Sequence, residues 1–561
     1  MRQAIQPTSR GVVPWPAEAA ARYVARGYWR GLPLAAHIYA AGRAAPDAVC
    51  LADGEVRLTF REVLARADGA AQRLHEAGLR SDDRVVMQLP NCWQFAVLMV
   101  ALLRLGVIPA MALPANRRQD IAAIVAHIQA RALFVPGTAR GFDLQAMAHD
   151  IAAESDTVDH VLVLGGEQAP GSVDIDALCA PATDPAAASA ALDAAAPDPG
   201  TVSLFMLSGG TTGAPKLIPR THNDLAYMCT RAAEICRVGP GDAYLAALPL
   251  GHGFPLSGPG LLGTLAAGGR VVMVSSPAPE RAFAAIERER VTITSLVPAT
   301  LQRWIEHRDR DRGADLSSLR LVQLGGSHLP VSLAKRVAPT LGCTLQQVYG
   351  MSEGLLCLTR PDDPAEVILH TQGRPICPDD EILLVDAAGD PVPAGEPGVL
   401  LTRGPYTPRG YYRAPELDAQ AFVGDGWYRT GDIVRQRPDG NLVIEGRDKD
   451  VINRGGEKIA ADEVEHVVLR IAGISAAAAV AMPDPELGER ICLYVVPEPG
   501  ATVTLDQVRS TMERFGMARF KLPERLILVD DLPRTSVGKL DKRALRADLH
   551  RRLAAGAQPA N

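Results

Sequence analysis

Short apolar runs alternate with longer amphipathic stretches through most of the chain. Each run is bounded by turn-forming or polar residues, which is typical of a buried strand, whereas the stretches between the runs have helical spacing. Strands that alternate with helices predict a wound α/β architecture with parallel strands. The rhythm is clearest at VVMQLP (85–90), RALFVPG (131–137), HVLVLG (160–165), RVVMVS (270–275), ITSLVP (293–298) and RLVQLGG (320–326).

The N-terminal part predicts two helices. Residues 15–29 place aromatic side chains on one side of a helix, which we expect to pack on the main body. Residues 56–90 read as a strand, a long helix and a second strand. Thr59 is expected to cap the long helix, because Glu62 three residues later completes a capping box.

Three later segments depart from this rhythm. Residues 180–199 are rich in Ala and Pro and predict a surface loop or linker. Residues 381–412 contain short strands separated by Gly and Pro turns, which indicates a β-rich subdomain. A final α+β unit is expected from Val451, with a basic helix after Thr535.

Composition narrows the class of protein. The 561 residues carry 58 Lys and Arg against 64 Asp and Glu, a net charge of −6, and 47% of them are hydrophobic. This acidic balance, without a cluster of basic residues, argues against nucleic acid and membranes as partners. Nine scattered cysteines without a C-x-x-C pair, and an N-terminus without a signal-peptide pattern, predict a reduced, cytoplasmic protein.

The most apolar stretch, residues 95–113, is too interrupted for a membrane span. Arg104, Gly106 and Pro109 divide it. We expect a buried helix followed by a strand.

Residues 208–216, SGGTTGAPK, follow the apolar strand VSLFML and combine glycines, hydroxyls and a lysine. Glycine lets backbone N–H groups approach a polyphosphate, hydroxyls donate to its oxygens, and Lys216 adds positive charge. The spacing differs from that of a Walker A loop. An ordinary flexible loop can have the same composition, so both interpretations are open on this segment alone. The candidate phosphate-binding residues are Ser208, Gly209, Gly210, Thr211, Thr212 and Lys216.

Together with four later motifs, this segment resembles the adenylate-forming superfamily of acyl- and aryl-CoA synthetases. The later motifs are YGMSEG (349–354), YRTGD (428–432), GRDKDVINRGGEK (446–458) and PRTSVGK (533–539). Within the superfamily, residues 10–550 look most like the stand-alone 2,3-dihydroxybenzoate and salicylate AMP ligases. The stretches that carry this closer resemblance include LPNCWQF, MALPANRRQD and HGFPLSGPG.

The resemblance implies a two-domain α/β fold. A large N-terminal adenylate-forming domain would combine wound α/β subdomains with a β-rich subdomain, and a small, mobile C-terminal domain would be α+β. We therefore expect an adenylation core at residues 1–446, a hinge at 447–450 and a lid domain at 451–561.

The resemblance also implies catalytic roles. Such enzymes join a carboxylate to the α-phosphorus of ATP, so they must neutralise charge and hold an in-line geometry. Lys539 would bridge the carboxylate and the α-phosphate. Glu353, with Thr212, would bind Mg²⁺ and so offset the charge of the phosphates.

A second group of residues would bind the nucleoside. By resemblance, Asp432 would accept both ribose hydroxyls, and Arg447 would donate to the same ribose. Adenine would lie between Tyr349 and the backbone of Gly325 and Gly326. A turn or helix cap at Asp432, and a purely structural Gly-Gly turn, are the alternative interpretations.

The hinge would let one site serve two half-reactions. By resemblance, Lys449 is the hinge, and rotation exchanges the loop around Lys539 for the INRGGEK loop, whose Gly456 would line the tunnel of a pantetheine thiol. Four charges in residues 447–450 are otherwise typical of a solvated loop.

The resemblance places an aryl-acid pocket at residues 251–258, with His252 near the substrate carboxylate. This chain has Gly where the relatives usually have Asn at 253 and often have Ser at 258, so the pocket should be larger and lack a reader of the ortho hydroxyl. A bicyclic or differently substituted acid would then fit. Alternatively, Ser327 or ordered water replaces the lost contacts and the substrate is an ordinary hydroxybenzoate. The predicted pocket residues are Gly253, Phe254, Gly258, Ser327 and Leu356.

These features predict an ATP- and Mg²⁺-dependent ligase. It would activate an aromatic carboxylic acid and load it onto the phosphopantetheine thiol of an aryl carrier protein in siderophore or nonribosomal peptide biosynthesis. One alternative is an aryl-CoA ligase that uses free coenzyme A. A second, from a different class, is a non-catalytic adenylate-binding protein, against which the joint presence of Lys539, Glu353, Asp432 and Lys216 argues.

Overall fold

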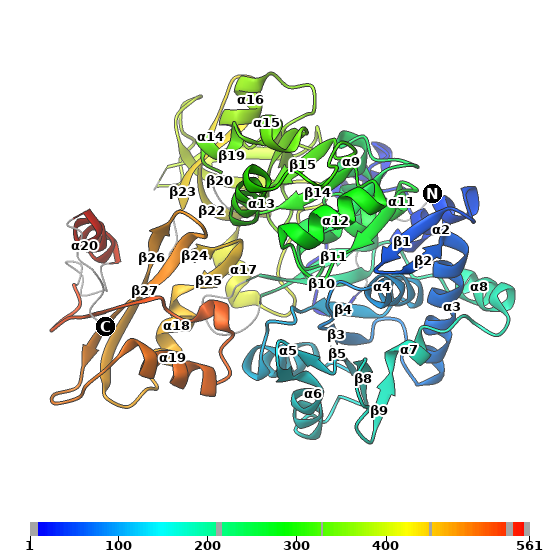
Figure 1. Cartoon of the computed structure of the whole chain (residues 1–561), viewed down its shortest axis with the longest axis horizontal. Coiled ribbons are helices and arrows are strands. Elements are labelled where there is room, and N and C mark those ends of the chain that lie inside the picture. Colours follow the sequence, from blue (N-terminus) through cyan, green and yellow to red (C-terminus); the bar gives the residue numbers. More distant parts are fainter. Residues whose placement is uncertain are drawn as a thin grey trace.

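The computed structural model describes residues 9–208, 216–326, 329–386, 388–447, 451–533 and 542–554. Two large sheets and a smaller one form the main body, and a fourth sheet with its helices stands beside them (Figure 1). The predicted α/β architecture with a large N-terminal and a small C-terminal domain is confirmed.

The first large sheet has seven strands, and all its neighbouring strands run parallel except the β10–β11 hairpin. Three of the apolar runs expected to be strands form β3, β5 and β8. In spatial order the strands are β11 (Lys216–Thr221), β10 (Val202–Ser208), β4 (Ile108–Met111), β3 (Arg84–Met87), β5 (Ala132–Pro136), β8 (His160–Leu164) and β9 (Ser172–Asp174).

The second large sheet has nine strands and a parallel centre, with antiparallel strands at both edges. The other three apolar runs form β13, β14 and β15. In spatial order the strands are β18 (Arg374–Pro375), β17 (Leu356–Leu358), β16 (Thr344–Gly350), β15 (Leu321–Leu324), β14 (Ile293–Leu296), β12 (Ala243–Ala246), β13 (Arg270–Met273), β1 (Val49–Asp53) and β2 (Val56–Thr59).

Helix α4 (Trp93–Leu105) lies between the two large sheets, because it contacts β1 of one sheet and β4 of the other. Its side chains are buried on nearly every face, so it reads as a continuous apolar run. The helices that share its core are α2 (Leu34–Ala44), α3 (Phe60–Glu76), α9 (His222–Ile235) and α11 (Gly260–Ala266). Thr59 caps α3 through the predicted capping box with Glu62.

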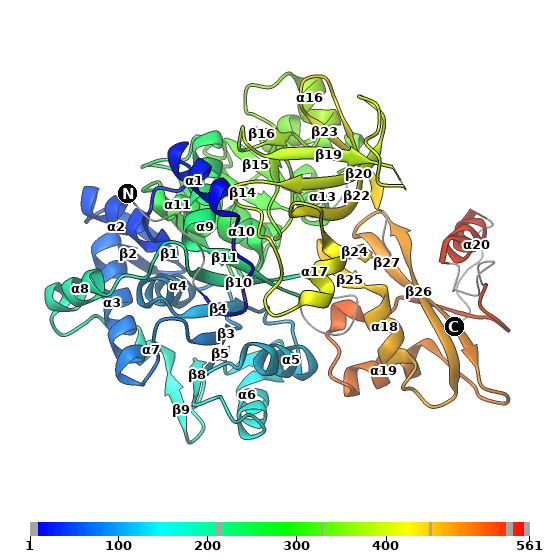
Figure 2. The same cartoon turned by 180° about the vertical axis from the view of Figure 1, so that it is seen from behind.

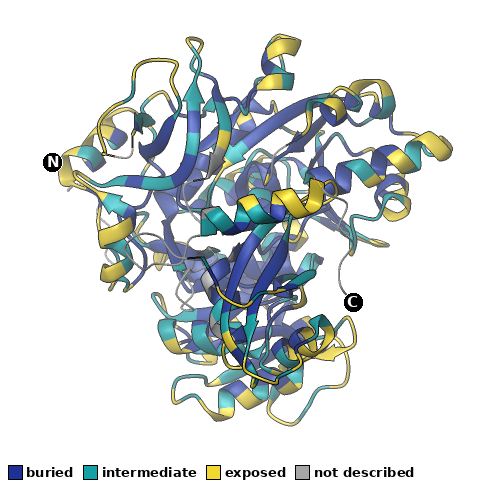
Figure 3. Cartoon of the chain, turned by 90° about the vertical axis from the view of Figure 1, so that its left-hand side faces the viewer, coloured by how far each residue is buried: buried dark blue, intermediate teal, exposed yellow. Residues whose placement is uncertain are grey.

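Of the remaining helices of the main body, α7 and α8 pack on α3 and most of the others cover the sheets; Figure 3 shows exposed residues on outer helices and buried residues along the strands. These helices are α5 (Arg118–Ile128), α6 (Leu144–Ala153), α7 (Ile175–Leu178), α8 (Pro185–Ala194), α12 (Pro279–Glu289), α13 (Pro298–Arg310), α14 (Val331–Ala334), α15 (Val337–Leu341) and α16 (Ala365–His370). The short helix α10 (Gly253–Ser257) borders the cavity described below.

Two further sheets and a small hairpin of β6 (Thr138–Ala139) and β7 (Phe142–Asp143) complete the described chain. The predicted β-rich subdomain contains β19 (Glu381–Val385), β20 (Gly398–Arg403), β21 (Phe422–Val423), β22 (Trp427–Gln436) and β23 (Leu442–Arg447), with α17 (Pro415–Ala421). The C-terminal sheet contains β24 (Val451–Arg454), β25 (Glu457–Ala460), β26 (Ile474–Asp484), β27 (Gly488–Pro497) and β28 (Arg525–Leu528). Its helices are α18 (Ala461–Val468), α19 (Leu505–Arg514), the 3-10 turn η1 (Arg519–Lys521) and α20 (Lys542–Ala554).

Two expectations needed correction. The Ala- and Pro-rich residues 180–199 contain a helix, α8, because Asp184 caps it, Pro185 begins it, and its Leu192 is buried. The N-terminal helix α1 spans only Ala17–Ala25. Trp15 and Trp29 lie outside it, packed edge to face on one another, with their indole N–H groups on carbonyls of the β-rich subdomain.

Arg104, which interrupts the apolar stretch, is buried with a charge partner. Its guanidinium lies 3.4 Å from Asp68 and 2.6 Å from Asp193, and 6% of its side chain is exposed. Within the described ranges, the chain has no helix that is both long and apolar enough to cross a bilayer.

Candidate active site

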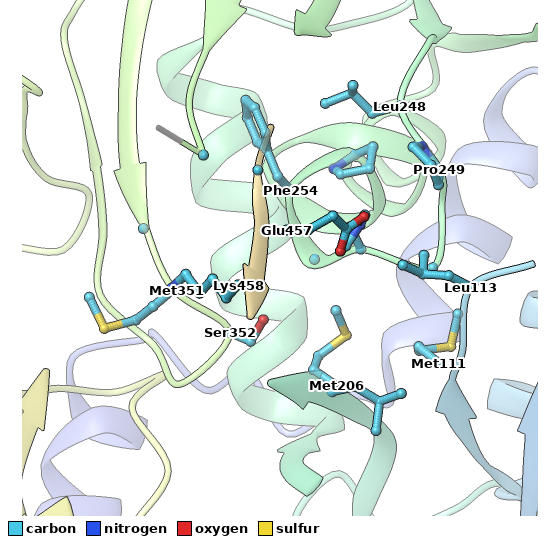
Figure 4. A pocket seen from close by; sticks show the side chains of 18 of the residues that line it. Met111, Leu113, Met206, Leu248, Pro249, Phe254, Met351, Ser352, Glu457 and Lys458 are labelled. Atoms are coloured by element: carbon cyan, nitrogen blue, oxygen red, sulfur yellow. The ribbon is translucent and has the colours of Figure 1, made fainter. Parts of the chain in front are cut away.

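A cavity of about 310 Å³ lies where the main body meets the small domain (Figure 4). Strands β4 and β10 contribute Met111 and Met206, and the loop after β16 contributes Met351 and Ser352. The small domain closes it with the turn between β24 and β25 and with η1. The cavity is therefore built jointly by residues far apart in the sequence.

Five of the predicted acid-site residues come together in one wall of this cavity. His252 precedes α10 as its N-cap, and the helix turns the pocket segment inward. The residues in this wall are His252, Gly253, Phe254, Gly258 and Leu356. Their binding of an aryl acid stays a prediction.

The two unusual glycines do leave room. A Cβ added to Gly258 would make ordinary contacts, 3.5 Å from the Phe254 carbonyl oxygen and 3.8 Å from Leu356 Cδ2. A Cβ on Gly253 would lie 3.0 Å from the flexible end of Met206 and 3.6 Å from Ser352 Oγ. Side chains at these positions would therefore point into space that the cavity now occupies.

The predicted nucleoside residues form a second group beside the cavity. Tyr349 at the end of β16 donates its hydroxyl to Asp432 Oδ2 at 2.7 Å, and Asp432 is buried on β22. Arg447, the last residue of β23, lies opposite Asp432 in the sheet register. Tyr349 and Asp432 are not among the described residues that line the cavity.

Gly325 and Gly326 follow β15, and each needs to be glycine. A Cβ on Gly325 would lie 2.9 Å from the Val348 carbonyl oxygen, and Gly326 has φ +86°. The carbonyl of Gly326 accepts a hydrogen bond from Asn453 Nδ2 of the small domain at 2.7 Å. A side chain would meet backbone at Gly325 and would strain the left-handed conformation at Gly326.

Glu353 is buried near the predicted phosphate loop. Its Oε1 lies 3.1 Å from the hydroxyl of Tyr411, and 4% of the residue is exposed. Lys216 Nζ lies 5.4 Å from the ring centroid of the same tyrosine. Because Ser208 pairs with Lys216 across the β10–β11 ladder, both ends of the predicted loop are held in place.

Several predicted residues lie outside the described ranges, so the structure leaves their roles as predictions. They are Gly209, Gly210, Thr211, Thr212, Ser327, Lys449 and Lys539. The predicted boundaries at residues 447–450 are likewise untested.

The donor set suits Mg²⁺ better than a metal that needs a protein cage. In the part of the chain that the structure describes, no group of three or more His, Cys, Asp or Glu side chains could hold a metal. Mg²⁺ is usually held by one or two carboxylates together with substrate phosphates and water. A single buried carboxylate at Glu353 fits that pattern.

An ion pair between His252 and Glu457 joins the main body to the small domain at the cavity. Glu457 of β25 lies 3.0 Å from His252 Nε2. Burial alone would lower the pKa of His252, but the Glu457 carboxylate outweighs it and raises that pKa above its usual value. Burial alone would raise the pKa of the Glu457 carboxyl group. The His252 imidazolium outweighs burial and lowers this pKa below its usual value.

A charged cluster of one lysine and two carboxylates joins the domains on the other side of the cavity. Lys521 Nζ of η1 lies 2.9 Å from Asp120 of α5 and 2.7 Å from Glu463 of α18. Burial opposes the charge of Lys521, but the two carboxylates raise its pKa. This cluster was not anticipated, because 401 positions separate Lys521 from Asp120 and no local pattern connects them.

Other lining residues were also missed. Glu457 stands inside the INRGGEK motif and was within reach of sequence reasoning. Met111, Met206 and Arg220 lie on or next to apolar strands, where only the fold reveals which side chains face the cavity.

Comparison with known proteins agrees with this geometry. The AMP-binding enzyme family model matches residues 38–412, and the AMP-binding enzyme C-terminal domain model matches residues 463–539. A 2-hydroxy-7-methoxy-5-methyl-1-naphthoate–CoA ligase of Streptomyces carzinostaticus is 58% identical over 97% of this chain and 98% of its own. A salicyl-AMP ligase / salicyl-S-ArCP synthetase of Mycobacterium tuberculosis is 47% identical over 95% and 94%.

A solved structure matches as well. The apo structure of Mycobacterium smegmatis MbtA has a TM-score of 0.73 and 42% sequence identity, and the match covers 95% of this chain and 98% of that one. The chain therefore belongs to the AMP-binding enzyme family of adenylate-forming ligases. Within the family it groups with the aryl-acid AMP ligases, as the sequence motifs predicted.

The contact between His252 and Glu457 predicts a titration. Glu457→Gln should lower the pKa of His252 from above 6.5 to below it, because burial then acts without the opposing carboxylate. In the wild type the ion pair is present below the raised pKa and is lost as pH rises through it. NMR titration of the His252 ring protons measures both values. Glu463→Gln, a control on the other side of the same cavity, should leave the His252 titration unchanged; an equal change in both variants would contradict the assignment.

Proposed function

We propose that this chain activates an aromatic carboxylic acid with ATP and then transfers the aryl group to a thiol. One observation carries the proposal: Gly253, Phe254 and Leu356 of the main body line the same cavity as the glycine turn of the small domain, Gly455 and Gly456. An aryl ring and a thiol arm can thus reach one shared space.

In the first half-reaction, a carboxylate oxygen attacks the α-phosphorus and the bond to pyrophosphate breaks. Lys539 neutralises the meeting anions; Glu353 and Thr212 would hold Mg²⁺, which would offset the phosphate charge. The phosphates lie on the loop from Ser208 to Lys216. The ribose binds Asp432 and Arg447, and adenine lies between Tyr349 and the Gly325–Gly326 backbone.

In the second half-reaction, the thiol sulfur attacks the aryl carbonyl carbon, AMP leaves, and the thiol proton passes to solvent. The arrangement of the small domain supports a role in this step, because its Gly456 turn faces the cavity. Helix α20, which begins three positions after Lys539, lies at the far edge of that domain (Figure 1, Figure 2). We therefore propose that rotation about Lys449 exchanges the two loops between half-reactions.

The preferred acid is larger than salicylate. Gly253 and Gly258 leave space for a second ring, and Met111, Met206 and Met351 offer it an adaptable apolar wall. The naphthoate named for the Streptomyces carzinostaticus relative is bicyclic, in line with this size.

The acceptor is a pantetheine thiol, for which two sources are open. The relatives are named for both, coenzyme A in one case and ArCP in the other. We propose an aryl carrier protein in siderophore or nonribosomal peptide biosynthesis, with free coenzyme A as the alternative. Thioester formation measured with each acceptor separates them.

Acid-dependent ATP–pyrophosphate exchange tests the first half-reaction and the size of the acid. The wild type should exchange with 2-hydroxy-1-naphthoate and salicylate. Gly253→Asn should shift the kcat/KM ratio toward salicylate by about 1–2 kcal/mol, because its side chain fills the space beside Met206 and Ser352. Gly258→Ala, which adds a methyl group at ordinary contact distance, is the milder control. If none of the aryl acids supports pyrophosphate exchange, the proposed function is wrong.

A pair of variants should separate the half-reactions. Lys539→Ala should abolish exchange while thioester formation from supplied aryl-adenylate survives. Gly456→Ala should leave pyrophosphate exchange intact and slow thioester formation about tenfold. The reason is that Gly456 has a φ of +95° and an added Cβ would lie 3.2 Å from Val297.

Gly500→Ala is the matched control for the glycine variant. It has a similar φ of +80°, but its Cβ meets nothing within 4 Å. It should change neither half-reaction. If Lys539→Ala and Gly456→Ala each impair both steps equally, the two-loop account fails.

A further inference from the structure

A buried arginine borders the acid cavity. Arg220 lies on β11, next to its last residue, and only 1% of it is exposed, yet its side chain is part of the cavity wall. A guanidinium is costly to bury unless its N–H groups find acceptors. What those groups bind therefore decides what Arg220 does.

Three acceptors within the protein account for part of its hydrogen-bonding capacity. Nε donates to Asp224 Oδ1 at 2.6 Å, and Nη1 donates to the Ser352 carbonyl oxygen at 3.2 Å. Among the residues that the structure describes, Nη2 has one acceptor, the thioether sulfur of Met228, at 3.5 Å. Arg has five N–H donors, and a thioether is a weak acceptor. Arg220 thus keeps donor capacity at the cavity, with its charge balanced by Asp224.

Gly253 opens the space next to this donor. A Cβ on Gly253 would lie 3.0 Å from Met206 Cε and 3.6 Å from Ser352 Oγ, and the carbonyl oxygen of the same serine accepts a hydrogen bond from Nη1 of Arg220. An Asn at position 253 would extend into this space. Without it, a ring substituent of the acid can occupy the corner formed by Met206, Ser352 and Arg220.

We propose that Arg220 determines specificity by donating a hydrogen bond to an oxygen on the aryl ring beside the carboxylate. The inference rests on the proposed aryl-acid activity and names the substituent that the cavity selects. A guanidinium offers donors and no acceptor, so it favours a hydroxyl or phenolate oxygen over an amino group. An acid that carries only hydrogen at this ring position would leave the buried donors unpaired. Such an acid should therefore be a poorer substrate.

A purely structural role is the competing explanation. Arg220 connects Asp224 of α9 with the loop that carries Glu353, so its loss could disturb catalysis with every acid. The two explanations differ in one observable. A structural residue changes kcat/KM for all acids by the same factor, whereas a specificity residue changes the ratio between acids.

The test compares 2-hydroxy-1-naphthoate, 1-naphthoate and 2-amino-1-naphthoate in pyrophosphate exchange. The wild type should favour the hydroxy acid by roughly 10- to 100-fold over the other two. Arg220→Lys keeps the charge beside Asp224 but loses the planar fork, and should cut that preference at least about fivefold. It should change kcat/KM for 1-naphthoate much less. Arg231→Lys, in an exposed pair with Glu234, is the matched control and should leave all ratios unchanged.

Each outcome decides the matter. Equal loss for all three acids in Arg220→Lys, or a wild type without preference for the hydroxy acid, overturns the assignment while leaving the aryl-acid activity intact. Absence of exchange with any aryl acid instead overturns the proposed function. If Arg220→Lys does not fold by circular dichroism, Ser352→Ala decides. If Ser352→Ala keeps the preference for the hydroxy acid, the result supports Arg220 as the hydrogen-bond donor. If the preference is lost, the hydroxyl of Ser352 recognises the ring oxygen instead.

Discussion

Polar contacts around one cavity join the small domain to the main body in the part of the chain that the structure describes. His252 with Glu457, Lys521 with Asp120, and Asn453 with the Gly326 carbonyl join the two parts. Polar contacts of this kind can be exchanged for water when a domain turns, unlike an apolar interface whose separation exposes a large hydrophobic area. The proposed alternation between half-reactions depends on this property of the interface.

Within the main body, the cavity owes its shape to backbone as much as to side chains. Gly325 and Gly326 allow backbone conformations and approaches that a side chain would disturb, and Gly253 and Gly258 leave space at the cavity, where we propose that the acid binds. The rigid parts are the parallel strands beneath them, whose ends carry these loops. Because strands buried on both faces change little, substrate choice can be adjusted by single side chains in the loops.

The sequence predicted the fold well where local chemistry suffices. The apolar strands, the capping box at Thr59 and the β-rich subdomain follow from periodicity and turn residues. Helix α8 was missed because alanine and proline also suit loops, and its Asp184 cap was overlooked. Five of the predicted acid-site residues line the cavity, since they come from two short segments, whereas Ser327 lies outside the described residues.

What the sequence could not reveal depends on long-range geometry. Lys521 and Asp120 meet only because the small domain docks on α5. Arg220 reads as an ordinary residue near the end of a strand, and its position beside the space at Gly253 follows from the packing of β11, α9 and the loop after β16. Residue spacing predicts contacts within one helix, strand or turn, and it does not reveal which positions of different domains meet in the fold.

The most direct test of the account is a crystal structure with a non-hydrolysable aryl-adenylate analogue, in which a sulfamoyl group replaces the phosphate. The account predicts an aryl ring between Gly253, Phe254 and Leu356 and a ribose on Asp432. An aryl ring outside this cavity, or a nucleoside far from Asp432, would contradict it.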